Sequence, residues 1–185
     1  MSSPPTRSQG ESARYTGVAI FLHWLSAFVI AGMLALGWYM TSVEDEPGSE
    51  RWFGLHQSVG VLLAMLIAFR LVWRITHRPQ PLPYTVPAWQ AKAAHTLHAL
   101  LYAAMIAMPL TGIAGAMLDK EGLTLFGQSV PRIFAVQHDL AENLFDVHGA
   151  IAAVLACMIG VHMLAAIKHL AIDKDGVFQR MWFRR

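Results

Sequence analysis

The segment DVHGAIAAVLACMIGVHMLAAIKHL, residues 146–170, contains an uninterrupted run, Val147–Ile167, without Lys, Arg, Asp or Glu. About 20 helical residues cross the hydrocarbon core of a bilayer, so this run is long enough to span a membrane. It carries two histidines, His148 and His162. Ionisable side chains are costly inside a membrane and normally mark a functional site. The segment therefore predicts a membrane helix that carries a site.

Three more runs without charged residues precede this one, at Tyr15–Val43, Trp52–Phe69 and Ala93–Leu118. Only 14% of the 185 residues are charged and 55% are hydrophobic, whereas about 25% of residues in soluble domains are charged. This composition favours membrane lipid as a partner and gives no indication of nucleic acid. We predict an all-α fold, an integral membrane four-helix bundle that forms a single domain over residues 1–185. Its spans are expected at about 17–41, 54–76, 93–118 and 144–171.

The basic residues are unevenly distributed between the two sides of such a bundle. Three of the 14 fall on the side opposite the tails, namely Arg51, Lys120 and Arg132. The others fall on the tail side: Arg7, Arg14, Arg70, Arg74, Arg78, Lys92, Lys168, Lys174, Arg180, Arg184 and Arg185. Because Lys and Arg accumulate in cytoplasmic loops, we expect both termini in the cytoplasm and a multi-pass protein of the bacterial inner membrane. The first apolar run exceeds the roughly 7–15 residues of a secretion signal, so we expect it to be retained.

The proline content and the length of the connections between the spans predict their structure. Four prolines predict that 77–92 forms an extended strap instead of another helix; they are Pro79, Pro81, Pro83 and Pro87. Pro109 predicts a kink in the third span. The 119–146 connection is the longest, and we expect it to cover the external mouth of the bundle.

Four histidines pair by depth in this topology. His148 and His162 project from nearly the same face of the fourth helix, about 40° apart and roughly 21 Å apart along its axis. The first helix runs outward and places His23 near the cytoplasmic face, at the level of His162. The second helix begins outside and places His56 at the level of His148. The sequence therefore predicts one pair near each face, between facing helices of a bundle core.

Paired imidazoles favour haem over a bare metal ion. Zinc or iron held only by protein normally has three or four ligands, often carboxylates or thiolates. The charge-free runs contain no carboxylate and one cysteine, Cys157, which we expect to be a small buried apolar side chain. A porphyrin iron held by two axial imidazoles needs no carboxylate or thiolate from the protein. The alternatives are histidines that only hydrogen-bond between helices and a haem-free metal-binding or transport bundle.

Five histidines remain. His95 and His98, at the cytoplasmic start of the third span, are candidates for alternative ligands, for binding propionates or a quinone, or for interfacial residues. His169 follows His162 on a similar face and is a candidate for a helix-end role. All three lie where a cytoplasmic proton donor to a quinone would be useful. His77 and His138 fall in connections, where we expect no specific role.

Four segments resemble the bacterial cytochrome b561 family, which are small dihaem, quinone-linked cytochromes. The segments are FLHWLSA (21–27), GLHQSVGVLLAMLIAFRLVWR (54–74), AAHTLHALLYAAMIAMPLTG (93–112) and DVHGAIAAVLACMIGVHMLAAIKHL (146–170). The resemblance extends from about residue 15 to residue 172. It implies that His23 and His162 bind one haem b and that His56 and His148 bind the other, which agrees with the pairing by depth.

The resemblance also implies a function, which is electron transfer with ubiquinone. A related bacterial type is a superoxide oxidase, in which the external haem would take an electron from periplasmic superoxide and the internal haem would reduce quinone. Arg51, Lys120 and Arg132 are the external cations that would attract the anion. Electron transfer itself needs no acid-base or nucleophilic apparatus. The alternatives are another periplasmic redox protein as donor, and a haem b anchor subunit of a dehydrogenase or hydrogenase.

Overall fold

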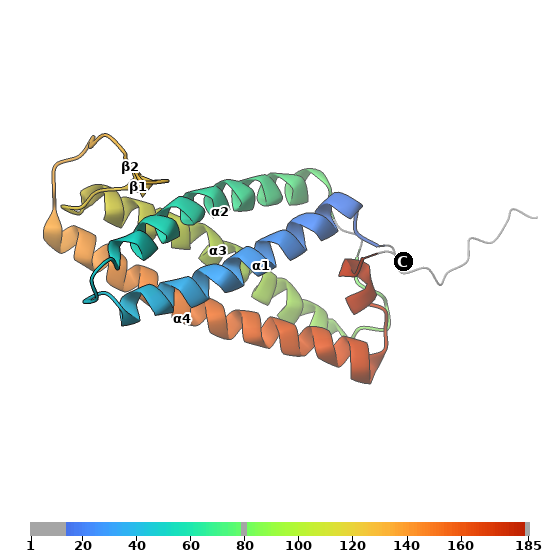
Figure 1. Cartoon of the computed structure of the whole chain (residues 1–185). Coiled ribbons are helices and arrows are strands. Elements are labelled where there is room, and N and C mark those ends of the chain that lie inside the picture. Colours follow the sequence, from blue (N-terminus) through green and yellow to red (C-terminus); the bar gives the residue numbers. More distant parts are fainter. Residues whose placement is uncertain (1–13, 79–80, 184–185) are drawn as a thin grey trace, which may run out of the picture.

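The computed structural model describes residues 14–78 and 81–183, and four long helices make up most of it (Figure 1). These are α1 (Gly17–Ser42), α2 (Glu50–Thr76), α3 (Ala88–Leu118) and α4 (His138–Lys168). Strands β1 (Thr124–Leu125) and β2 (Gln128–Ser129) form a small antiparallel hairpin between α3 and α4. A π-helical turn η1 (His169–Asp173) and a 3-10 turn η2 (Phe178–Met181) follow α4. The predicted all-α fold with four apolar spans is confirmed.

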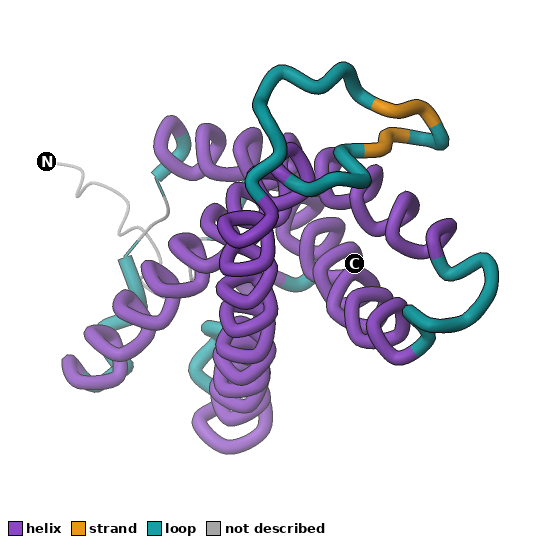
Figure 2. The backbone as a smooth tube through the Cα atoms, turned by 90° about the vertical axis from the view of Figure 1, so that its left-hand side faces the viewer, coloured by secondary structure: helices purple, strands orange, loops and turns teal. Residues whose placement is uncertain are grey.

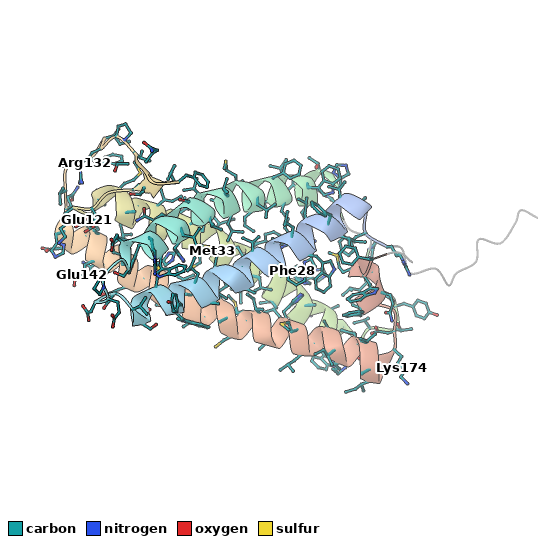
Figure 3. All side chains as sticks on the ribbon, in the orientation of Figure 1. Phe28, Met33, Glu121, Arg132, Glu142 and Lys174 are labelled. Carbon is teal, nitrogen blue, oxygen red and sulfur yellow. The ribbon has the colours of Figure 1, made fainter. Side chains whose placement is uncertain are left out.

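The outer surface of the helices is apolar. All four described helices are long and apolar enough to cross a membrane. Large side chains such as Phe28 on α1 and Leu164 on α4 are 70% and 68% exposed, and Figure 3 shows Phe28 pointing away from the bundle. Cys157 is also exposed, so its expected burial inside the protein was wrong. Such a surface suits lipid, which is as apolar as a leucine side chain.

The core lies at mid-height in the bundle. Helix α3 packs along α4, α1 along α2, and α2 against α3. Every helix contributes to one buried cluster, formed by Ile30, Ile67, Leu101, Met105 and Leu155. Leu155 stands midway between His148 and His162 on α4. The cluster therefore separates the levels of the two predicted pairs.

Several helices begin earlier than the predicted spans. Helix α2 starts at Glu50 and α4 at His138, because an acid in the first turn favours a helix N-terminus and needs no burial in lipid. Helix α3 starts directly after Pro87, so 88–92 is helical and not part of a strap; proline suits a helix start, where its missing N–H is not needed.

The kink predicted at Pro109 does not end the helix, because α3 continues through Pro109 to Leu118. Four residues named in the sequence predictions lie outside the described residues: Arg7, Pro79, Arg184 and Arg185.

The hairpin is attached to the start of α2. The Thr124 amide donates to Gln57 Oε1 at 2.7 Å, and the Phe126 amide donates to Ser58 Oγ at 2.8 Å. Phe126 and Gly127 have φ angles of 51° and 80°, which a tight two-residue hairpin turn requires. The connection is 119–137, shorter than expected because α4 begins at His138. Figure 2 shows it at one end of the helices, toward one side of the bundle, and we call this the hairpin end.

The opposite end of the bundle, which we call the terminal end, holds both ends of the described chain (Figure 1). The Tyr15 amide donates to the Arg180 carbonyl at 3.3 Å. Trp24 Nε1 donates to the Met181 carbonyl at 2.8 Å, and Arg180 Nη1 donates to the Pro81 carbonyl at 3.0 Å. The C-terminal segment is thus fastened to α1 and to the proline-rich connection.

Candidate functional site

The bundle contains two histidine pairs, and within each pair the two rings face each other. At the terminal end, the ring centres of His23 on α1 and His162 on α4 are 6.2 Å apart, with planes at 70°. At the hairpin end, the ring centres of His56 on α2 and His148 on α4 are 6.1 Å apart, with planes at 77°. The structure therefore brings together both of the predicted pairs, at the two predicted levels.

The ring separations fit one metal ion between the members of each pair. A ligating imidazole nitrogen lies about 2 Å from a metal, and the ring centre roughly 1 Å further, so two axial imidazoles have centres about 6 Å apart. Histidines in direct hydrogen bonding would instead bring two ring nitrogens within about 3 Å. Neither pair shows such a bond among the described residues, although His–His hydrogen bonds are a usual alternative for membrane histidines.

The His148 ring has a fixed orientation. Its Nδ1 lies 2.9 Å from the Met108 carbonyl and 3.3 Å from Thr111 Oγ1. A carbonyl only accepts, so Nδ1 carries the proton and Nε2 keeps its lone pair for a metal. The ring also lies against α3, where a Cβ added at Gly112 would stand 2.9 Å from its Cε1 atom. Met108 and Gly112 on α3 thus position a residue of α4.

His56 has a different environment. Its Nδ1 atom is buried and lacks a hydrogen-bond partner among the described residues. A buried unpaired polar atom is costly and uncommon in a folded protein. The ring lies close to α1, where a Cβ added at Gly37 would stand 3.4 Å from Cε1. A half-buried imidazole whose Nδ1 is enclosed but forms no hydrogen bond between helices fits a metal ligand better than a helix–helix contact.

Arg70, which the sequence analysis counted among the tail-side basic residues, contacts the terminal-end pair. It lies inside α2, and its Nη2 is 2.8 Å from His23 Nδ1 while its Nη1 donates to Ser26 Oγ at 2.6 Å. Arg70 and Arg74 both lie 5.6 Å from the centre of the Tyr102 ring. Among the described residues, neither arginine forms an ion pair with a carboxylate. This end of the bundle therefore has positive charge available for an anionic group.

Comparison with known proteins places these features in a family. The family model for prokaryotic cytochrome b561 matches residues 14–184. The chain belongs to the prokaryotic cytochrome b561 family. It is thus a bacterial-type membrane cytochrome that takes part in electron transport, and the cofactor implied by its family is haem b.

Three curated relatives of this cytochrome cover nearly its whole length. Cytochrome b561 homolog 2 of Escherichia coli K12 is 33% identical over 174 residues, which are 91% of this chain and 90% of that protein. Cytochrome b561 homolog 1 of the same strain is 27% identical over 93% of this chain and 98% of its own. Probable superoxide oxidase CybB of Yersinia pestis is 27% identical over 91% and 95%.

The other predicted candidates of the cytochrome lie at the terminal end. The His98 ring on α3 is half-buried, with its centre 5.3 Å from that of His162. His95, one turn earlier, is exposed. His169 lies just beyond α4, with Nδ1 2.7 Å from Asp175 Oδ2. His98 is thus the one of the three that adjoins a predicted ligand.

Two histidines and three cations lie away from the pairs. His77 stacks on Trp73 with ring centres 3.9 Å apart, and His138 is exposed at the start of α4. The predicted external cations lie at the hairpin end with local partners: the guanidinium of Arg51 lies over the Trp52 ring, Lys120 pairs with Glu121, and Arg132 donates to the carbonyls of Asp119 and Lys120. Figure 3 shows the acids Glu121 and Glu142 at the same end as Arg132.

Proposed function

We propose that this cytochrome binds two haem b groups, one between His23 and His162 and one between His56 and His148, and passes electrons between them. The observation that carries the proposal is the pair of facing imidazoles, 6.1 and 6.2 Å apart at their ring centres, at two levels of a single helix. When bound, haem supplies reversible one-electron chemistry. Family membership supplies the cofactor class.

The protein's own residues set the conditions for this chemistry. The Met108 carbonyl accepts from His148 Nδ1, which makes the other ring nitrogen a better electron donor to a metal. The apolar cluster around Leu155 and Ile67 fills the space between the two levels. A packed apolar interior excludes water and keeps the local dielectric low. The interior between the two levels is therefore packed and apolar.

Arg70 is proposed to neutralise a haem carboxylate at the terminal end. A neutral His23 that binds iron through Nε2 carries its proton on Nδ1 and cannot accept from Arg70. The guanidinium must then donate to another acceptor, and a propionate fits its planar, bidentate geometry. Arg70 is already among the side chains that surround this pair, because it contacts both His23 and Ser26.

Replacing Arg70 with glutamine is expected to lower the midpoint potential of one haem. Loss of a buried positive charge favours the oxidised, more positive form, and a unit charge at about 8 Å in an effective dielectric of about 20 corresponds to roughly 50–100 mV. A potentiometric titration followed by absorbance measures the change. Arg74→Gln is the control, since Arg74 shares the Tyr102 contact but has no contact with His23. Equal potentials in the wild type and both variants would exclude this role for Arg70.

For the direction of electron flow, we propose that superoxide in the periplasm is the donor and ubiquinone is the acceptor at the terminal end, with both termini in the cytoplasm. The excess of basic residues on the tail side supports this orientation. Similarity to the probable superoxide oxidase of Yersinia pestis supports the donor, whereas the acids around Arg132 argue against strong electrostatic attraction. His98, His95 and His169 are the candidates for contacting the quinone.

The purified protein, supplied with enzymatically generated superoxide and a soluble ubiquinone analogue, tests this function. We expect one quinol for every two superoxide anions, with two protons taken up and two molecules of dioxygen released. If dithionite reduces the haems but superoxide yields no quinol, the donor assignment is wrong. Quinol formation only after addition of a dehydrogenase or hydrogenase partner would identify the protein as an electron-transfer subunit instead.

A further inference from the structure

A histidine and an aspartate lie in contact just beyond the last membrane helix. His169 Nδ1 is 2.7 Å from Asp175 Oδ2, and the side chains are only 15% and 10% exposed. The second oxygen, Oδ1, accepts from the Val177 amide at 3.1 Å. Since an ionised carboxylate only accepts, His169 Nδ1 is the donor and Nε2 remains available for another partner. The carboxylate thus fixes one tautomer of the imidazole.

The backbone is shaped to make this contact. Residues six apart do not meet on a regular helix, where neighbours are three or four apart. Here η1 is a π-helical turn, Lys174 has a left-handed φ of 50°, and Gly176 follows with a φ of 80°. A left-handed lysine is uncommon and costs conformational energy, and single π turns occur frequently at functional sites. The reversal carries Asp175 back to His169.

The pair formed by His169 and Asp175, which we call the dyad, lies on the side of α4 that faces the terminal-end pair. His169 follows His162 by seven residues, which on a helix is about 20° around the axis and about 10 Å along it. The segment after Asp175 is held against α1 by the bond from Trp24 to the Met181 carbonyl. The Trp24 ring in turn lies 5.6 Å from that of His23. The dyad therefore occupies the outer side of the level at which quinone reduction is proposed.

We propose that His169 delivers protons to the quinone and that Asp175 is the residue that positions it; this rests on the proposed function. Each quinone oxygen must receive one electron and one proton. The imidazolium gives its Nε2 proton to a quinone oxygen and keeps its Nδ1 proton on Asp175. Nε2 then takes a proton from water at the terminal end. Two such proton transfers, with the two electrons that a bound terminal-end haem would supply one at a time, would complete the quinol.

The surrounding charges favour this role over a cation site. His169, Asp173 and Asp175 have ligand atoms close enough for a divalent cation. However, the Lys168 ammonium already pairs with Asp173, and its positive charge opposes a second cation. The other charged or titratable groups near this end of the elements that pack here are Lys174 after η1 (Figure 3), Arg180 on η2, His162 on α4, and Lys92, His95 and His98 on α3.

The test compares Asp175→Asn with Asp173→Asn as a matched control, in the full-length, haem-loaded protein. For Asp175→Asn we expect quinol formation to fall at least about 10-fold, with the haem content and the rate of haem oxidation by ferricyanide unchanged. Asp175→Glu, which keeps a carboxylate that can accept from His169 Nδ1, should recover much of the lost rate. Asp173→Asn should lower the rate much less, because Asp173 Oδ2 is 3.4 Å from the same Nδ1 and already pairs with Lys168.

Several results would overturn the proposal. One is a wild-type rate of quinol formation in Asp175→Asn, and another is an equal loss of rate in Asp175→Asn and Asp173→Asn. Abolition of wild-type turnover by EDTA, with recovery on adding Mg²⁺, would favour the cation site. If the wild type exchanges electrons with ferricyanide but never reduces quinone, the proposed function itself fails, and the variants need not be compared.

Discussion

Replacing His148 with alanine is expected to remove the haem at the hairpin end and to leave the haem at the terminal end bound. The variant loses an axial ligand, and no other described histidine except His56 lies with its ring beside it. Haem content per chain should fall from about two to about one, and a redox titration should lose one of two transitions. His56→Ala should give the same result, because both imidazoles would bind the same iron.

The opposite pair provides the reciprocal control. His23→Ala and His162→Ala should each remove the terminal-end haem and retain the other. At this level His98 lies beside His162, so recovery of haem in His23→Ala but not in His23→Ala/His98→Ala would make His98 a substitute ligand. Loss of both haems from all four single variants would contradict independent sites and would mean that one haem is required for folding.

Replacing Gly112 with alanine is expected to impair the same hairpin-end haem without changing any ligand. The added Cβ would lie 2.9 Å from Cε1 and 3.0 Å from Nδ1 of His148, a separation that real Cβ contacts do not tolerate. The ring must turn or α3 must retreat, and either change weakens the bond to the Met108 carbonyl. We expect the haem content to fall toward one per chain and the remaining transition to match that of His148→Ala.

Gly160→Ala on α4 is the matched control, because an added Cβ there meets nothing within 4 Å. Alanine exceeds glycine in helix propensity by about 1 kcal/mol, so neither substitution should weaken its own helix. A different outcome at the two positions must therefore come from contact with His148. Two fully occupied haems in Gly112→Ala, with unchanged potentials, would show that the ring has room to adjust.

The spans and the histidine pairs were predictable because both depend on simple regularities. Runs without charge predict membrane helices, and depth along antiparallel helices brings His56 to the level of His148. The helix starts were missed because the first turns of α2 and α4 carry charged residues, among them Glu50 and Asp139. Charge is tolerated where a helix extends beyond the hydrocarbon, so hydropathy underestimates helix length.

Arg70 was counted only among the tail-side basic residues, because only its charge was considered. Its position held a usable signal: it follows His56 by 14 residues, the same interval that separates His148 from His162. On one helix that interval places it on a similar face, at the level of the other pair. The role of Gly112 and the contact of Asp175 with His169 had no such signal. The first depends on how closely α3 approaches His148, and the second on the π-helical turn and left-handed residues after α4; neither is encoded by spacing.

The absorption spectrum of the purified, dithionite-reduced protein, combined with extraction and counting of its haem, tests the two-haem assignment most directly. The two facing pairs predict a b-type α band and two haems per chain. A spectrum without a b-type α band would contradict haem binding altogether. A single haem per chain that is lost equally from His23→Ala and His148→Ala would contradict one haem at each level.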